Sequence, residues 1–337
     1  MIGGMTSSMI EVLTPIWQRV LRRSPISVED NFFDLGGDPS SAQTLLAEIA
    51  QICGREFPAV AICYAPTISA LAAMLEQPAT KPLPPLVLLK AGLAGPPIFI
   101  THGIGGSALD LVNLARGIET QQPIYGMQMR GMDGIEEPFD RIEDMAQWFL
   151  DALKQVQDQG PYFLVGYSLG GLTTLEMAQR LRAEEQKIAL LAMLDSYPDI
   201  RHLSAGQRTR LMLRLGLMRA GSTFHSVLHR LPSETSRDRS AVHRLSGSSV
   251  IRALENVRER SYLALRNYRP RLYNGNIKFV RAEINTFFPG DPVPVWSHLA
   301  DEIEIETIPG DHLEMLTTQS VKLAFVLSHW LREASSE

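Results

Sequence analysis

The feature that most constrains the fold is a strand-to-helix turn in the middle of the chain with the pattern Gly-x-Ser-x-Gly. An apolar run of strand-forming residues, 162–165, precedes it, and apolar residues recur at helical spacing from Leu172 onward. Gly166 and Gly170 remove side chains that would crowd a sharp turn, so the hydroxyl of Ser168 can project from it. Backbone N–H groups at the start of the helix can stabilise a developing negative charge. The turn therefore predicts a nucleophilic serine.

The same pattern also occurs in ordinary turns, so the interpretation depends on residues elsewhere in the chain. Asp195 directly follows a fully apolar strand at 188–194, and His312 follows an alternating strand at 303–308 through a Pro-Gly-Asp turn. A serine hydroxyl is a weak nucleophile until a base removes its proton. We expect His312 to be that base and Asp195 to fix its tautomer and stabilise the imidazolium.

Other residues compete for these roles. Asp199 and Asp311 are weaker candidates for the acid, because neither directly ends a predicted strand. His102 is a competing base or a supporting residue in the loop after the strand at 97–101. Either Asp195 or His312 alone is compatible with an ordinary polar loop residue, so their joint placement carries the argument.

Two backbone N–H groups are expected to form an oxyanion hole. The N–H of Leu169 is the first candidate, because Leu169 begins the helix after the serine. The second is expected from the loop after the 97–101 strand. We favour Ile104 there, because Gly103 and Gly105 let its backbone approach closely.

From residue 86 onward, strands and helices alternate. This order predicts a mostly parallel sheet covered by helices on both faces, with sites beyond the carboxyl ends of the strands. The expected strands are 86–89, 97–101, 123–128, 162–165, 188–194, 276–282 and 303–308, and the expected helices include 142–156 and 321–331.

The first part of the chain reads as a small helical unit. Apolar residues at helical spacing predict helices from about residue 9 to 21 and from 38 onward, and Thr67 is expected to cap a third. Asp38 is a good N-cap, and Pro39 fits the first helical position, where no N–H bond is missed. The Pro-rich segment 78–85 is expected to be an extended linker.

The motif Asn31-Phe32-Phe33-Asp34-Leu35-Gly36-Gly37-Asp38 and the later Pro66-Thr67-Ile68 resemble the acyl or peptidyl carrier domain of nonribosomal peptide and polyketide synthases. In that family the residue after Gly-Gly-Asp is a serine that carries a 4'-phosphopantetheine arm. Pro39 occupies that position here and has no hydroxyl, and Ser40 lies a quarter turn further around the helix. We therefore expect an arm-less docking domain, with modification of Ser40 as the weaker alternative.

The motifs around Ser168, Asp195 and His312, together with His102-Gly103-Ile104-Gly105-Gly106, resemble the α/β-hydrolase thioesterase domain that ends such synthases. The resemblance implies a carrier-like domain at 1–77, a linker at 78–85 and a thioesterase domain at 86–337 with a helical lid at about 201–271. It also implies that an acyl or peptidyl group passes from a carrier thiol to Ser168, and then to water or an internal nucleophile, in product release or editing.

Two alternatives remain open, a carboxylic ester hydrolase of the same fold and a non-catalytic docking protein, because a fold does not fix a substrate. Turnover of acyl thioesters against oxoesters would separate the first from a thioesterase. The expected partners are acyl- or peptidyl-loaded carrier domains, whose arms would hold the phosphopantetheine.

Charge and composition narrow the remaining function classes. The net charge of −5 gives no sign of nucleic-acid binding. The sequence has no long apolar run and only two cysteines without metal-type spacing, so we expect a cytoplasmic protein without a membrane segment or a metal. The predicted lid holds fifteen arginines, no lysine and four acids. This is either a solvated helical surface or one that steers the phosphate of an arm or an acidic carrier.

Overall fold

The computed structural model describes residues 3–77, 81–203, 205–206, 208–209, 249–284 and 291–336. The first of its parts is a helical unit, as the sequence predicts. Its helices are α1 (Gly3–Leu21), α2 (Pro39–Cys53), α3 (Ala61–Tyr64) and α4 (Ile68–Glu76). The sequence did not reveal α3, because a single helical turn has no periodicity to detect.

Aromatic packing and helix caps hold the helical unit together. Trp17 of α1 is fully buried and meets the ring of Phe32 edge to face, with 5.2 Å between the ring centroids. Asp38 caps α2, since its carboxylate accepts from the N–H of Ser41 at 2.7 Å. Thr67 caps α4 in the same way, as the sequence predicts. The motif residues that resemble a carrier domain therefore perform structural roles here.

The second part is built on a seven-stranded sheet with the order β1-β3-β2-β4-β5-β6-β7. Among the described strands, only the edge strand β1 is antiparallel to its neighbour. This confirms the predicted mostly parallel sheet. The strands are β1 (Leu86–Lys90), β2 (Ile98–Thr101), β3 (Ile124–Met127), β4 (Tyr162–Tyr167), β5 (Ile188–Leu194), β6 (Tyr273–Ile284) and β7 (Ala300–Asp311).

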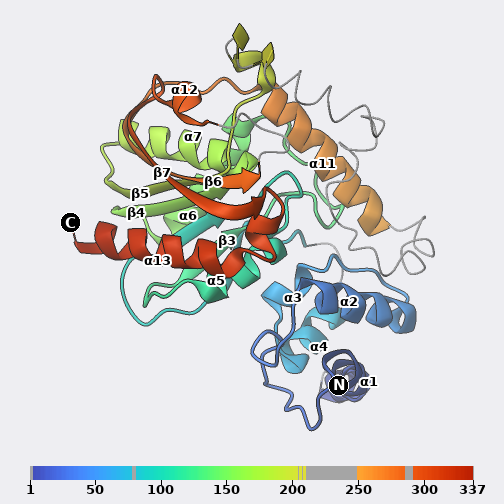
Figure 1. Ribbon diagram of the computed structural model, residues 1–337. Helices are drawn as coiled ribbons and strands as arrows, with labels where there is room; N and C mark the ends of the chain where they lie inside the picture. Colours follow the sequence, from blue (N-terminus) through green and yellow to red (C-terminus); the bar gives the residue numbers. More distant parts are fainter. Residues whose placement is uncertain are drawn as a thin grey trace.

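Helices cover both faces of the sheet, and Figure 1 shows α7 and α13 on opposite sides of the strands. Successive residues of β2 serve the two faces: Ile98 and Ile100 join the core with α5 and α13, whereas Phe99 joins the core with α6 and α7. These helices are α5 (Val112–Gly117), α6 (Ile142–Val156), α7 (Leu169–Ala183) and α13 (Ser320–Ser336). Shorter helical turns are η1 (Ala108–Leu111), η2 (Ile200–His202), α12 (Val293–Trp296) and η4 (Glu314–Leu316).

The last two strands are longer than the sequence predicts. β7 continues through Pro309 and Gly310 to Asp311, because Asp311 pairs with Ile284 at the end of β6 after a register shift. Gly310 has a φ of 87° there. The expectation that Asp311 does not end a strand is therefore wrong. His312 directly follows β7.

The segment between β5 and β6 is only partly described. Its longest described helix, α11 (Ser249–Asn267), lies within the helical lid expected at about 201–271. Residues 210–248 of the expected lid, with its dense leucines and methionines at 211–213, 215, 217 and 218 and its glycines at 216, 221 and 247, lie outside the described residues.

The helical unit packs against the hydrolase part, and one hydrophobic core runs from the unit into one face of the sheet. The hydroxyl of Tyr64 donates to the carbonyl of Pro84 at 2.6 Å. Arg116 on α5 pairs with Asp34 at 2.6 Å. Figure 1 shows the unit beside α5 and the start of α11.

Candidate active site

Ser168 lies at the tip of the turn between β4 and α7, where its backbone has φ 56° and ψ −120°. Such a conformation costs a serine about 1–3 kcal/mol. A Cβ atom on Gly166 would lie 2.3 Å from the carbonyl oxygen of Gly170, and one on Gly170 would lie 2.4 Å from that of His102. Only glycine fits at these two positions. The turn therefore has the crowded, strained backbone that the pattern predicts.

Asp195 and His312 come together although 117 residues separate them in the chain. The Nδ1 atom of His312 lies 2.8 Å from Oδ2 of Asp195, and both side chains are buried. The other carboxylate oxygen of Asp195 accepts from the N–H of Ala282 at 3.3 Å, and the N–H of Asp195 donates to Val280 at 2.7 Å. Asp195 is thus fixed by β6, with one oxygen turned to the histidine.

Tyr167 ties His312 to the serine turn. Its hydroxyl donates to the backbone carbonyl of His312 at 2.7 Å, and the two rings stack with 4.8 Å between centroids. Because Tyr167 precedes Ser168 directly, His312 is held beside the turn. The tertiary fold therefore places the three predicted site residues just beyond the carboxyl ends of β4, β5 and β7.

The two alternative acids are engaged elsewhere. The carboxylate of Asp199 accepts from the N–H and the Nε of Arg201 at 2.9 and 2.7 Å. The carboxylate of Asp311 accepts from the N–H groups of Leu313 and Glu314 at 2.9 and 3.0 Å, which closes the turn after β7. The imidazole of His312 pairs with Asp195 instead.

His102, the alternative base, is buried in an apolar environment. Its Nδ1–H donates to the carbonyl of Gly103 at 2.6 Å, and its ring meets Phe149 edge to face. Burial lowers the pKa of His102 to about 4, so the ring is neutral at physiological pH. Its Nε2 atom is buried without a hydrogen-bond partner among the described residues. This environment suits a residue that supports the loop rather than one that exchanges protons.

The loop with Ile104 lies next to Ser168. A Cβ atom on Gly103 would lie 3.4 Å from Cβ of Ser168, which shows how closely the loop backbone approaches the turn. The N–H of Gly106 donates to the carbonyl of Gly103 at 3.1 Å, so the loop closes on itself around Ile104. This geometry is compatible with an N–H donor close to the serine.

Gln128 fixes this loop, and we did not predict it from the sequence. It is fully buried, donates from Nε2 to the carbonyl of Gly106 at 2.8 Å and accepts from the N–H of Ala108 at 3.0 Å. The N–H of Met129 also donates to Gly106 at 3.1 Å. The sequence offers one indication of this role. Gln128 is the polar residue at the end of the otherwise apolar 123–128 run, and a buried amide must form hydrogen bonds.

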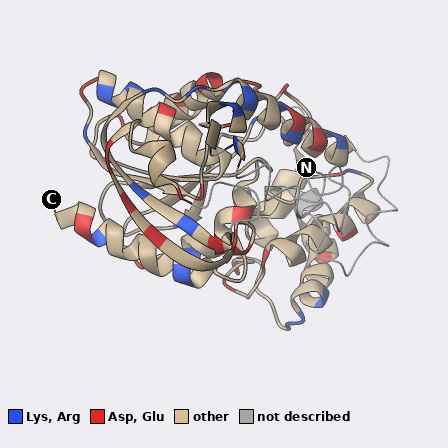
Figure 2. Ribbon diagram, turned by 45° about the horizontal axis from the view of Figure 1, so that its top comes forward, with Lys and Arg blue, Asp and Glu red and all other residues tan. Residues whose placement is uncertain are grey.

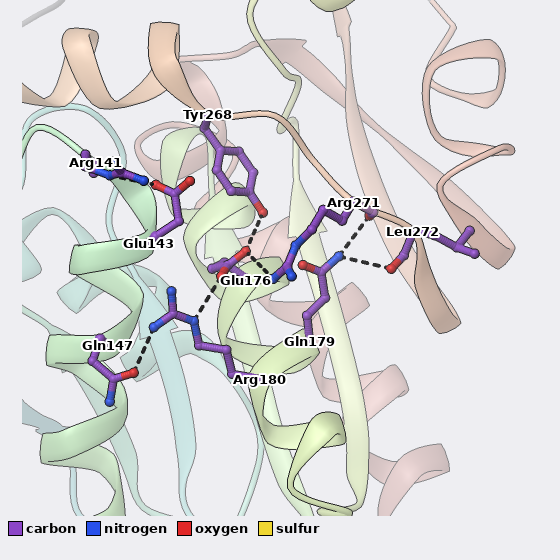
Figure 3. Close-up of polar contacts among 9 residues, drawn as sticks. All are labelled: Arg141, Glu143, Gln147, Glu176, Gln179, Arg180, Tyr268, Arg271 and Leu272. Atoms are coloured by element: carbon purple, nitrogen blue, oxygen red, sulfur yellow. Dashed lines mark hydrogen bonds and ion pairs between the residues drawn. The ribbon is translucent and has the colours of Figure 1, made fainter.

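Glu176 on α7 is a charged residue, yet it is only 2% exposed. Figure 3 shows that its carboxylate contacts residues of α7 itself and of the segment that follows α11. Arg180 donates from Nε at 2.9 Å, Arg271 donates to both oxygens at 3.2 Å, and the hydroxyl of Tyr268 donates at 3.2 Å. Burial and the charge of Glu176 raise the pKa of Tyr268. The network joins α7 to the segment after α11.

Several arginines of the predicted lid pair with acids of the hydrolase part. Arg260 pairs with Asp140 at 3.0 Å, and Arg201 and Arg271 pair with acids as described above. Figure 2 shows basic and acidic residues interspersed over the described helices. Part of the positive charge that the sequence suggested for steering is therefore neutralised locally.

The position expected to carry a phosphopantetheine arm does not offer the required hydroxyl. Pro39 is the first residue of α2, after the N-cap Asp38. The hydroxyl of Ser41 belongs to the capping box, since it accepts from the N–H of Asp38 at 2.8 Å. Ser40 is exposed. Ser40 is thus the one exposed hydroxyl in the first turn of α2.

Two properties concern the described part of the chain as a whole. None of its helices has both the length and the apolar character needed to cross a membrane. Among the same residues, no cluster of histidine, cysteine and acidic side chains is arranged to hold a metal ion.

Comparison with known sequences agrees with the two-part architecture. Residues 11–75 match the family model of the phosphopantetheine attachment site, and residues 96–331 match that of the thioesterase domain. A dimodular nonribosomal peptide synthase of Bacillus subtilis is 31% identical over 319 residues, which cover 90% of this chain but 13% of that protein. An indigoidine synthase of Dickeya dadantii is 34% identical over 53% of this chain and 12% of its own length. The chain thus spans a small part of these relatives.

Solved structures show the same fold. A four-domain nonribosomal peptide synthetase bound to AMP and glycine superposes with a TM-score of 0.61 at 21% identity, over 95% of this chain and 26% of its own. The type II thioesterase BorB from the borrelidin biosynthetic cluster gives a TM-score of 0.54 at 19% identity, over 73% of this chain and 97% of its own. Because the thioesterase model matches more than half of the chain, the protein belongs to the thioesterase domain family.

Proposed function

We propose that this chain is a serine thioesterase that removes acyl or peptidyl groups from the phosphopantetheine arms of partner carrier domains in nonribosomal peptide or polyketide biosynthesis. The observation that carries the proposal is the buried Asp195–His312 pair, with 2.8 Å between Oδ2 and Nδ1, held beside the strained turn of Ser168. The thioesterase family match and the carrier-like unit upstream support the substrate class.

In this mechanism, His312 removes the proton of Ser168 as its oxygen attacks the thioester carbonyl. The N–H groups of Leu169 and Ile104 stabilise the negative oxygen of the tetrahedral intermediate. The C–S bond then breaks, and the thiol leaves with the proton from His312. Water or an internal nucleophile of the substrate attacks the acyl-serine in turn, and Ser168 regains its proton.

Asp195 supports both half-reactions without reacting itself. With Nδ1–H of His312 bonded to the carboxylate, Nε2 is left to accept and return the proton. The carboxylate also stabilises the imidazolium that forms transiently. In this role the carboxylate must keep its orientation, and the hydrogen bond from the N–H of Ala282 holds it in place.

The carrier-like unit of this chain is proposed to remain unmodified. Pro39 cannot accept a phosphopantetheine group, although residues 11–75 match the attachment-site family. The arm that delivers the acyl group is then the arm of a partner carrier. Modification of Ser40 is the competing possibility, since its side chain is exposed.

Mass spectrometry of the intact chain after mixing with a short acyl-pantetheine thioester tests the proposal. We expect one acyl adduct on Ser168 and faster turnover of the thioester than of the matching oxoester. An adduct on another residue contradicts the assignment of the nucleophile. Faster turnover of the oxoester instead favours a carboxylic ester hydrolase of the same fold.

A further inference from the structure

A hydrogen-bonded contact between Glu56 and Ser249 joins the carrier-like unit to the start of α11. One carboxylate oxygen of Glu56 accepts from the N–H of Ser249 at 2.9 Å and from its hydroxyl at 3.0 Å. The N–H of Val250 lies 3.5 Å from the same oxygen. Glu56 therefore reaches donors at the first two residues of α11, 193 and 194 positions further along the chain.

This contact has the chemistry of a helix cap. The first N–H groups of a helix have no partner within the helix, and the helix dipole concentrates positive charge at the same end. A carboxylate satisfies both requirements. Caps normally come from residues next to the helix, whereas this one comes from another structural unit.

Glu56 is well placed because its neighbours in sequence are anchored within the carrier-like unit. The guanidinium of Arg55 donates to the carbonyl of Leu75 at 3.4 Å and stacks over the ring of Phe57, 4.3 Å from its centroid. The unit itself is held to the hydrolase part by the Arg116–Asp34 ion pair and the shared hydrophobic core. The cap is therefore delivered by an ordered segment.

The helix that Glu56 caps lies against the loop expected to form the oxyanion hole. A Cβ atom on Gly106 would lie 2.6 Å from Cγ1 of Val257, and Val257 is fully buried. Gly106 is also the residue whose carbonyl Gln128 holds. Hence the position of α11 constrains the loop next to Ser168.

The far end of α11 is fixed to the helix that follows the nucleophile. Tyr268 and Arg271 bond to Glu176 on α7, as Figure 3 shows. Figure 1 shows α11 running as one straight element from the carrier-like unit across the hydrolase part. The helix is thus held at both ends and pressed on the oxyanion loop in between.

We propose that the carrier-like unit acts within its own chain as a positioning domain for the thioesterase site, with Glu56 as the positioning residue. By capping α11, Glu56 holds the helix against Gly106 and so keeps the loop around Ile104 in place. The catalytic part of this inference rests on the function proposed above. It also explains how the unit remains useful with Pro39 in place of the attachment serine.

Hydrogen exchange of the full-length chain, followed by mass spectrometry, tests the cap directly. In Glu56→Ala we expect the amides of residues 249–253 to exchange about fivefold faster, and those of 103–107 to exchange faster as well. Residues 42–49 in the core of the carrier-like unit should exchange as in the wild type. Glu29→Ala, which removes an exposed acid of the same unit, should change none of these segments.

Two further variants separate the cap from a general loss of structure. In Glu56→Gln an amide oxygen still accepts from the same donors, so exchange should stay within about twofold of the wild type. Ser249→Ala should raise exchange at 249–253 less than Glu56→Ala does, and the double variant should exchange no faster than Glu56→Ala alone, because both remove parts of one cap.

Steady-state kinetics then tests positioning. With a short acyl-pantetheine thioester, Glu56→Ala should lower kcat about fivefold with little change in KM, and Glu56→Gln should restore most of kcat. Unchanged exchange at 249–253, faster exchange at 42–49, or an unchanged kcat in Glu56→Ala overturns the proposal. If the wild type hydrolyses no thioester, the proposed function fails, but the exchange measurement still decides whether Glu56 caps α11.

Discussion

The starts of α2 and α7 differ, although the family motifs that this chain resembles have a reactive serine at each of these two places. The backbone conformation before the helix and the residue types there are opposite in character. At α7, Ser168 has a positive φ and is 9% exposed, in a turn that only glycine neighbours allow. At α2, Asp38 has an ordinary extended backbone and forms a complete capping box, with Pro39 at the next position. The first arrangement places a serine in a strained turn, whereas the second stabilises a helix and has no hydroxyl at position 39.

The difference shows that the carrier-like unit can form its helices with a proline at the position where the related carrier family has a serine. The carrier-like unit retains the buried Phe32 and the caps at Asp38 and Thr67, all of which stabilise its helices. The hydrolase part holds a strained serine turn and a buried Asp195–His312 pair, the two features on which the proposed reaction depends. Each prediction below tests one side of this contrast.

The largest expected effect is on activity at the α7 turn. Ser168→Ala should lower kcat/KM for an acyl thioester by about 10⁴-fold or more, because no other group in the mechanism can accept the acyl chain. The free energy of unfolding should stay within about 1 kcal/mol of the wild type. Steady-state kinetics and urea unfolding measure the two quantities. Activity of the variant at the wild-type level would show that Ser168 is not the nucleophile, whereas a wild type that hydrolyses no ester or thioester would favour the docking protein.

The acid should matter nearly as much as the nucleophile. Asp195→Asn should lower kcat by about 10³- to 10⁴-fold, because an amide no longer stabilises the imidazolium or selects the tautomer of His312. Asp199→Asn is the matched control, since Asp199 bonds to Arg201 and should affect kcat less than about threefold. Equal losses in both variants would show that the acid has been assigned wrongly.

The buried imidazole of His102 should make the free energy of unfolding depend on pH. Its pKa is about 4 in the folded chain and about 6.5 when unfolded, so the unfolded state binds an extra proton between these values. The free energy of unfolding should therefore fall as the pH drops from about 6.5 to 4, by about 3 kcal/mol from this residue alone. His102→Asn, whose amide N–H can replace Nδ1–H, should flatten this dependence.

Urea unfolding at pH 7 and pH 4.5 measures this slope. His298→Asn provides the comparison, because His298 is exposed and should leave the slope as in the wild type. An unchanged slope in His102→Asn would show that the imidazole is not held neutral by its surroundings.

The smallest effect on stability is expected at the start of α2. Pro39→Ser should change the free energy of unfolding by less than about 1 kcal/mol, because serine also suits the first helical turn. Incubation with CoA and a broad-specificity phosphopantetheinyl transferase should leave the wild-type mass unchanged and modify Pro39→Ser. A gain in wild-type mass that Ser40→Ala abolishes would instead assign the arm to Ser40.

Much of the architecture could be predicted, because local patterns report local structure. The strand before Asp195 has the predicted bounds, and the strand before Ser168 begins as predicted but continues past residue 165 to Tyr167. The caps at Asp38 and Thr67 follow from the side chains themselves. Errors occurred where tertiary contacts extend or create an element. β7 reaches Asp311 because it pairs with the end of β6, and α3 is a single turn between two loops.

The sequence by itself determined the type of fold, the chain order of Ser168, Asp195 and His312, and the proline at position 39 after Gly-Gly-Asp, because each depends on residue types at fixed spacing. Only the tertiary structure decided that His312 pairs with Asp195 rather than Asp199 or Asp311, since three nearby carboxylates look alike in a sequence. It also decided that Gln128 holds the loop at Gly106, that Glu176 is buried, and that Glu56 caps α11. These contacts join segments far apart in the chain, and periodicity describes only the face of an element, not the partner that covers it.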